Sequence, residues 1–282
     1  MKKRINLPGI ISKILAYAVL VLFAIIALVP VLYAVSTAFS GVNDIYKASY
    51  KWYFHPITFY SFKTIFEQYD LVRGFFNTLL YVIPPIGVGM FTSALAAFSF
   101  AKLEFPGKRI VFYAMLGTIV LPGVITLIPS YVMFSKFYHW NNTPLPLILP
   151  GMCGSVMTMF FIYQFFLTLP GELNDAARVD GMNWFGIFLK IILPLSKAVL
   201  ITQIILSFAG AYNDYLGPLL YVGTVEKYKT LQLIIATINT SQYVRHTYTM
   251  AGAVASMLPV FILFAFTQKY FVDGIVMTGL KG

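Results

Sequence analysis

Long apolar stretches separated by short polar segments dominate this chain. The run from Ile14 to Asn43 contains no Lys, Arg, Asp or Glu, and comparable runs recur along the sequence. A helix needs about 20 mostly apolar residues to cross a bilayer core of roughly 30 Å. The pattern predicts six transmembrane helices, near residues 14–39, 75–100, 110–134, 148–168, 194–213 and 249–270. We therefore expect an all-α integral membrane protein, with residues 1–282 forming one transmembrane domain.

Two of these predicted spans have an alternative reading. The first run follows the basic residues MKKR, as in a secretory signal peptide, but it is longer than the usual apolar region of a signal. An uncleaved span is therefore favoured. The fifth span is the least clear, because Lys197 interrupts its start and would have to reach the interface with its amine.

The basic residues predict the orientation of the chain. With six spans, twelve of the twenty Lys and Arg residues fall on one side, mostly in short loops. Short loops rich in Lys and Arg are typical of the cytoplasmic side. Both termini and the segment at 169–193 are therefore predicted to be cytoplasmic, whereas the loops at 41–73 and 214–248 are predicted to lie outside.

Two apolar features leave alternatives open. The outer loop at 214–248 contains LQLIIATI, which is too short to span and fits either a re-entrant or a surface-lying segment. In the second predicted span, Gly89, Ser93, Ala97 and Ala101 recur every four residues. Small residues at this spacing allow close helix packing, either within the chain or against a partner subunit.

Composition and missing motifs exclude several functions. Only 11% of the residues are charged, against about a quarter in soluble domains. The net charge of +10 is spread along loops, which fits membrane orientation better than nucleic-acid binding. Cys153 is the only cysteine, the three histidines are scattered, and no P-loop pattern occurs. We therefore expect neither a metal site nor an ATP site, and no catalytic constellation supports an enzyme.

The predicted spans also lack ionisable residues in their interiors. Ion-coupled carriers usually place such residues there, so their absence argues against a secondary carrier without excluding one. Asp214 is the exception, in the segment AYNDYLGPL at the outer end of the fifth span. A solvated helix cap is the simpler interpretation of this residue.

The segment LPGELNDAARVDG, residues 169–181, interrupts the apolar pattern. The 35 residues before Glu172 contain no Lys, Arg, Asp or Glu. Pro170 suits a first helical turn, early acidic residues complement the helix dipole, and Gly181 suits the position after a helix end. We predict a short helix of about ten residues, with Leu173, Ala176, Ala177 and Asp180 on one side. It would be either a simple connection or an element that docks on another protein.

The same segment resembles the EAA loop of ABC-importer permeases. That pattern reads Glu-Ala-Ala, three residues, Gly, nine residues, Ile, one residue and Leu-Pro. Six positions match in register: Ala176, Ala177, Gly181, Ile191, Leu193 and Pro194. Asp175 replaces the usual Glu, which keeps the charge on a shorter side chain. Residues 97–112, 128–143, 211–220 and the ending GIVMTGLKG are similar to carbohydrate-importer permeases of the maltose-transporter G-subunit type.

The resemblance implies a role and a set of partners. Such a permease forms half of a sugar pathway in the cytoplasmic membrane, together with a second permease subunit. Two ATPase subunits carry ATP and Mg, so this chain binds no cofactor, and an extracytoplasmic solute-binding protein delivers the sugar. The EAA loop acts as a coupling helix in a cleft of the ATPase. The substrate class implied is a sugar, of the oligosaccharide type. The alternatives are an ABC importer for a non-sugar solute such as a polyamine, or an ion-coupled carrier, and uptake measurements distinguish them.

Three groups of residues follow from the resemblance. The coupling loop comprises Glu172, Asp175, Ala176, Ala177, Arg178, Asp180, Gly181, Ile191, Leu193 and Pro194. Tyr212, Asn213 and Asp214 match the family's Trp-Asn-Asp segment, with Tyr in place of Trp, and would contact the pathway or the binding protein. The tail at Gly279, Lys281 and Gly282 would reach the ATPase.

Overall fold

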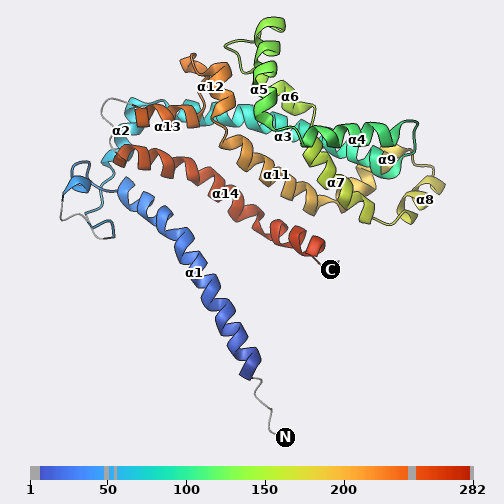
Figure 1. Cartoon of the computed structure of the whole chain (residues 1–282), viewed down its shortest axis with the longest axis horizontal. Coiled ribbons are helices and arrows are strands. Elements are labelled where there is room, and N and C mark those ends of the chain that lie inside the picture. Colours follow the sequence, from blue (N-terminus) through green and yellow to red (C-terminus); the bar gives the residue numbers. More distant parts are fainter. Residues whose placement is uncertain (1–6, 48–50, 54–55, 241–245, 280–282) are drawn as a thin grey trace. The chain divides into compact units, whose positions relative to one another are not determined.

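The computed structural model describes residues 7–47, 51–53, 56–240 and 246–279 (Figure 1). The regular secondary structure of these residues is helical. The chain divides into two compact units, Met1–Asp70 with Ile235–Met257, and Leu71–Ile234 with Leu258–Gly282. The all-helical class is therefore confirmed for the described residues, whereas a single domain over the whole chain remains a prediction.

The first unit is built around α1 (Leu7–Ala38), with the short η1 (Asp44–Tyr46) and α2 (Tyr60–Gln68) after it. The segment between α1 and α2 folds back onto the end of α1. The Thr58 backbone N–H donates to the Phe39 carbonyl at 2.8 Å. The Phe39 ring lies 5.2 Å from the ring of Phe59 and 4.8 Å from that of Phe62. Aromatic contacts thus fix the first predicted outer loop to the end of the first span.

The second unit is organised around α3 (Leu71–Lys102), which packs against three later helices. These are α6 (Leu145–Met152), α7 (Val156–Thr168) and α11 (Lys197–Tyr212). The remaining helices are α4 (Lys108–Ile119), α5 (Gly123–Val132), η2 (Met133–Phe137), α8 (Glu172–Val179), α9 (Trp184–Ile187), η3 (Phe188–Ile192), α10 (Leu193–Leu195), α12 (Leu216–Val222) and η4 (Glu226–Tyr228). Two helices, α13 (Leu231–Thr240) and α14 (His246–Gly279), contribute to both units.

Four helical segments are long and apolar enough to cross a membrane: Lys13–Ala38, Leu71–Lys102, Leu145–Thr168 and His246–Gln268. They coincide with the first, second, fourth and sixth predicted spans. The third and fifth predicted spans fall on bent pairs of helices, so that six spans result only if each bent pair is counted as one.

The two bends lie at proline-containing segments. Between α4 and the helix that begins at Gly123, the direction changes by 97°, and Pro122 occupies the break. The second bend, of 78°, separates Leu195 from Lys197 and follows Pro194. Proline lacks the N–H that continues a helix and restricts the residue before it, which accounts for the interruption at Pro122. After the second bend, α11 carries most of the fifth predicted span and begins at Lys197.

The small residues of α3 pack within this chain. A Cβ atom on Gly89 would lie 2.3 Å from the carbonyl oxygen of Gly151 at the end of α6. The Ser93 hydroxyl accepts a hydrogen bond from the Ser155 N–H at 2.9 Å, and Ala97 is fully buried. Of the two interpretations left open by the sequence, the structure shows packing against the chain's own α6 and α7.

The predicted outer loop at 214–248 is attached to the beginning of α3. The Asn77 side-chain amide donates to the carbonyls of Lys227 and Lys229, each at 2.9 Å. The Thr78 hydroxyl accepts from the Leu231 N–H at 2.9 Å. The LQLIIATI segment forms α13, in which Leu231, Leu233, Ile234 and Ile238 are buried. It is therefore a packed helix and not a surface-lying one.

Candidate coupling helix

The segment that the sequence singled out forms the short helix α8, Glu172–Val179. It begins two residues after Pro170, with Gly171 as its N-cap, and is slightly shorter than expected. Glu172 and Asp175 lie in the first turn and Arg178 lies in the last, so the charges complement the helix dipole at both ends. Local sequence signals therefore agree with the position and both ends of this helix.

The C-terminus of α8 is closed by two backbone hydrogen bonds around Gly181. The Gly181 N–H donates to the Arg178 carbonyl and the Met182 N–H donates to the Ala177 carbonyl, each at 3.0 Å. This pair of bonds is the Schellman arrangement, which needs a left-handed residue after the helix. Gly181 adopts that conformation, with φ of 80°. The predicted role of Gly181 in ending the helix is confirmed.

The two alanines of the motif point in different directions. Ala177 is only 3% exposed, whereas Ala176 is exposed. Ala177 and Asn174 face the chain's own core, so the side predicted for docking, with Leu173, Ala176, Ala177 and Asp180, is not free as a whole. Ala177 thus packs on its own chain, whereas Leu173, Ala176 and Asp180 are exposed, and the docking of this side remains a prediction.

A different face of α8 is open to solvent. It carries Glu172, Asp175, Ala176 and Val179, which are spaced as residues on one side of a helix. Val179 is 87% exposed, which is unusual for an apolar residue at the end of a polar helix. Val179 is not among the residues that the sequence pointed to. It lies seven residues after Glu172, a spacing that places both residues on one side of a helix.

Behind α8 lies an apolar cluster from four other elements, α3, α7, α9 and η3. Ala177 belongs to a buried cluster with Phe98 of α3, Phe166 of α7, and Ile187 and Phe188 after α8. The close packing of this cluster leaves α8 little freedom to move without its neighbours.

Polar and aromatic contacts add to this attachment. The Arg178 guanidinium lies 4.8 Å from the centre of the Trp184 ring, and that ring lies 6.3 Å from the ring of Phe98. The Lys102 amine, at the end of α3, donates to the Leu169 carbonyl at 2.9 Å. These contacts join both ends of the coupling loop to the end of α3.

The second half of the predicted loop forms α9, η3 and α10. The Asn183 side-chain oxygen accepts from the Gly186 N–H at 2.7 Å and so caps α9. Ile191 and Leu193 are partly buried and pack against the same apolar cluster, whereas Pro194 is exposed. The later motif positions thus hold the loop in place and do not form part of the exposed face of α8.

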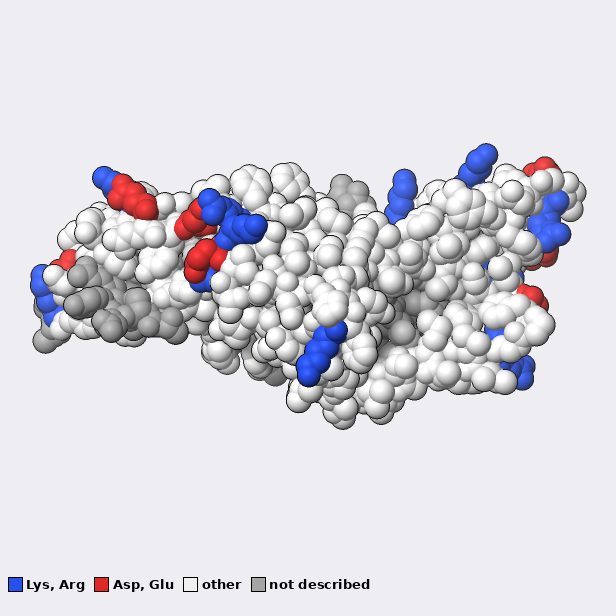
Figure 2. Space-filling view, turned by 90° about the horizontal axis from the view of Figure 1, so that it is seen from above, with Lys and Arg blue, Asp and Glu red and all other residues white. Residues whose placement is uncertain are grey.

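Charged side chains gather near α8. On the face drawn in Figure 2, side chains of both signs lie at the right-hand end, where α8 appears in Figure 1. A broad surface with few charges lies beside them. This distribution is typical of a helix outside an apolar membrane-facing region.

Tyr212, Asn213 and Asp214 lie at the far end of α11 and do not join α8. Tyr212 is fully buried, with its ring 5.4 Å from that of Phe208. The Asn213 amide donates to the Ala209 carbonyl at 2.8 Å, and the exposed Asp214 carboxylate accepts from the Gly217 N–H at 3.2 Å. The simpler reading of Asp214, as a cap at the start of α12, agrees with this bond. The cavity beside Asp214 measures about 70 Å³, which suits water and not a sugar.

The predicted tail is only partly described. Gly279 is the last residue of α14, while Lys281 and Gly282 lie outside the described residues. Among the described residues, no group of three or more His, Cys, Asp or Glu side chains could hold a metal ion.

Comparison with known proteins identifies the family. Residues 66–276 match the model of the binding-protein-dependent transport system inner membrane component. The chain belongs to this family. The predictions of an ABC-importer permease and of a transport subunit instead of an enzyme are thereby confirmed.

Individual relatives resemble this permease over nearly its whole length. The arabinooligosaccharides transport system permease protein AraQ of Halalkalibacterium halodurans is 30% identical, over 96% of this chain and 98% of its own. The maltodextrin transport system permease protein MdxG of Bacillus subtilis is 27% identical, over 96% and 97%. A chain of a bacterial ABC transporter involved in the import of the acidic polysaccharide alginate superposes with a TM-score of 0.81 at 21% identity, covering 96% of this permease and 100% of that chain. This last likeness concerns the fold.

Proposed function

We propose that this permease is the membrane subunit of an ATP-driven oligosaccharide importer and forms half of the translocation pathway. The observation that carries the proposal is the similarity, over nearly the full length of both chains, to permeases of arabinooligosaccharide and maltodextrin systems. Membership of the family supports the transport role, and the names of these relatives support an oligosaccharide as the substrate class.

The proposed topology has six spans with both termini in the cytoplasm. It counts each of the two bent helix pairs as one span. Twelve of the twenty basic residues then lie on the cytoplasmic side, in agreement with the distribution seen in membrane proteins generally. The protein would be a multi-pass component of the bacterial cytoplasmic membrane.

The proposed assembly contains a second permease, two ATPase subunits with ATP and Mg, and an extracytoplasmic solute-binding protein. In this assembly α8 docks on an ATPase subunit. Its exposed face, with Glu172, Asp175, Ala176 and Val179, provides the contact, and Asn174 and Ala177 hold the helix on its own chain. Gly279, Lys281 and Gly282 form a second contact with the ATPase.

The contacts of α3 suggest how movement of α8 would reach the outer side. At one end, α3 joins α8 through the apolar cluster around Phe98 and through Lys102. At the other end, it holds the predicted outer loop through Asn77 and Thr78. We infer that closure of the ATPase dimer moves α8 together with α3, so that the outer loop shifts as part of a rigid body.

Uptake by the reconstituted transporter tests the proposal. The full-length chain is co-purified with its partner subunits, and uptake of labelled arabinooligosaccharide and maltodextrin is measured with the binding protein. We expect uptake that requires ATP and continues when ionophores collapse the ion gradients. Uptake that is independent of ATP and stops with the ion gradient would assign a secondary carrier. ATP-dependent uptake of a polyamine, with no uptake of any oligosaccharide, would agree with an ATP-driven importer but would overturn the proposed substrate class.

A further inference from the structure

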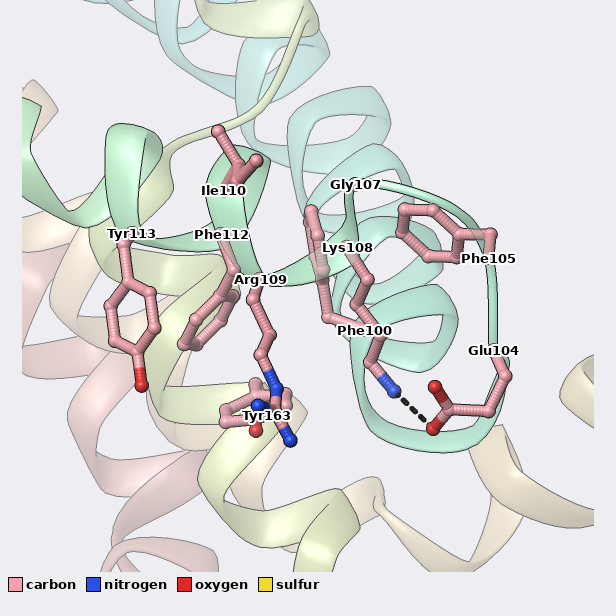
Figure 3. A pocket seen from close by; sticks show the side chains of 10 residues that line it. All are labelled: Phe100, Glu104, Phe105, Gly107, Lys108, Arg109, Ile110, Phe112, Tyr113 and Tyr163. Carbon is pink, nitrogen blue, oxygen red and sulfur yellow. Dashed lines mark hydrogen bonds and ion pairs between the residues drawn. The ribbon is translucent and has the colours of Figure 1, made fainter.

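An open pocket of about 640 Å³ lies where α3 ends and α4 begins. The α3–α4 connection and the first turns of α4 form most of its wall, and Tyr163 of α7 completes it (Figure 3). The pocket belongs to the second unit and shares no lining residue with the proposed coupling loop. Neither the transport role nor the docking of α8 accounts for it.

The pocket has one cation without an internal partner. The Lys108 amine donates to the Glu104 carboxylate at 2.8 Å and to the Leu103 carbonyl at 2.7 Å, so the single acidic side chain of the lining is already paired. Arg109 is exposed, and its guanidinium makes no hydrogen bond or ion pair with the described residues. Two cations and one carboxylate leave the lining with one net positive charge.

The backbone adds donors on the same side of the pocket. Gly107 precedes α4 in a left-handed conformation, with φ of 78°, and α4 has no side-chain cap. The N–H groups of Arg109 and Ile110 in its first turn have no acceptor among the described residues. Different oxygens of one phosphate group can accept from these N–H groups and, through the long Arg109 side chain, from the guanidinium.

The surroundings of the pocket indicate the source of the phosphate. The pocket lies between the end of one candidate span, Leu71–Lys102, and the start of the next apolar helix pair at Lys108. Ile110 is 76% exposed and Tyr113 is 68% exposed beside it. A free phosphate ion would gain nothing from these apolar side chains, whereas an acyl chain attached to a phosphate would cover them.

We propose that this pocket binds the phosphate group of an anionic glycerophospholipid at the end of the spans. Arg109 and the first turn of α4 bind the phosphodiester, the Tyr163 hydroxyl lies within the same pocket for the glycerol headgroup, and the acyl chains pass along Ile110 and Tyr113. A single net positive charge matches the single negative charge of a phosphodiester without a headgroup amine.

Native mass spectrometry of the full-length chain in neutral detergent tests this site. Phosphatidylglycerol is titrated against the wild type and against Arg109→Gln. The matched control is Lys197→Gln, which also removes one exposed cation but at another place in the chain. We expect Arg109→Gln to weaken retention of the first phosphatidylglycerol by about fivefold, from the loss of one cation near a lipid phosphate. Lys197→Gln should retain it as the wild type does. Equal retention by Arg109→Gln and the wild type, with equal melting temperatures, would overturn the proposal.

Two further titrations identify the ligand. Phosphatidylcholine, whose quaternary ammonium headgroup cancels the phosphate charge, should bind to the wild type several-fold more weakly than phosphatidylglycerol, and equal binding would refute the charge match. Excess inorganic phosphate should leave the bound lipid in place. If phosphate alone displaces the lipid and is lost in Arg109→Gln, the site belongs to a soluble phosphate and the lipid assignment fails.

Discussion

At the scale of single residues, the two alanines of α8 carry different constraints. Ala176 is exposed and Ala177 is buried against α3 and α7, although they are neighbours in the sequence. The sequence predicted the helix, its acidic start and its glycine end, because these signals act between residues a few positions apart. It could not predict which alanine is buried, because that depends on where α3 lies in space.

Replacing the two alanines by leucine should separate docking from folding. Ala177→Leu would add side-chain volume to a closed cluster and should lower the free energy of unfolding by about 1–3 kcal/mol. Ala176→Leu should leave the melting temperature of the purified chain unchanged and reduce ATP-dependent uptake at least several-fold. Thermal melting and uptake of both variants check this expectation. Wild-type uptake by Ala176→Leu would remove this residue from the proposed contact.

Gly181 offers a second test at this scale. A side chain at this position would meet no atom within 4 Å, so only the left-handed backbone opposes substitution. Gly181→Val should destabilise the helix end by roughly 1–2 kcal/mol, whereas Gly181→Asn should cost less, because Asn adopts this conformation more readily. Hydrogen exchange of the α8 amides and coupled uptake should rank the variants as wild type, Asn and Val. Equal behaviour of Asn and Val would contradict the Schellman explanation.

At the scale of elements, the positions of four apolar spans were predictable and the two bends were not. Span length follows directly from the thickness of the bilayer, so the positions of four spans agree with the pattern. The 97° and 78° bends depend on what the neighbouring helices allow at Pro122 and Pro194, and apolar character alone does not encode a direction. The lining of the α3–α4 pocket could not be predicted from the sequence either, because Tyr163 is far from Arg109 along the chain.

The contact between α3 and α6 predicts opposite effects for two glycines of one helix. A Cβ on Gly89 would meet the Gly151 carbonyl at 2.3 Å, whereas Gly87 has open space. Gly89→Ala should lower the melting temperature, because the backbones must separate. Gly87→Ala should leave it unchanged or raise it slightly, since Ala favours a helix by about 1 kcal/mol over Gly. Thermal melting of the purified chain distinguishes them, and an equal decrease in both would show that α3 and α6 do not pack as described.

At the scale of the molecule, α3 connects two distant parts of the second unit. Its 32 residues extend about 48 Å at 1.5 Å per residue. The coupling loop is attached at one end and residues 227–231 at the other. Apolar patterning predicted α3 as a span, but its role as a connection depends on long-range polar contacts that no local pattern contains.

Asn77 provides the test of this connection. Its amide donates to two carbonyls at 2.9 Å, and Asn77→Asp keeps its shape but removes both donors. Two hydrogen bonds of about 1 kcal/mol each should protect residues 227–234, so this variant should increase their hydrogen exchange by roughly thirtyfold. Uptake should fall while the complex with the ATPase still forms. Unchanged exchange in this segment would show that Asn77 does not hold the outer loop.

The division of α8 into an inner and an outer side has a consequence for subunit exchange. Under the proposed function, adapting the permease to a foreign ATPase would require changes among the exposed side chains of α8, which include Glu172, Asp175, Ala176 and Val179. Ala177 would have to stay matched to the apolar cluster behind α8, whichever ATPase drives the transporter. Transplanting the complete EAA segment from another importer would therefore disturb the packing of the recipient's apolar cluster. Grafting only the exposed side chains would change which ATPase the permease binds and leave that packing intact.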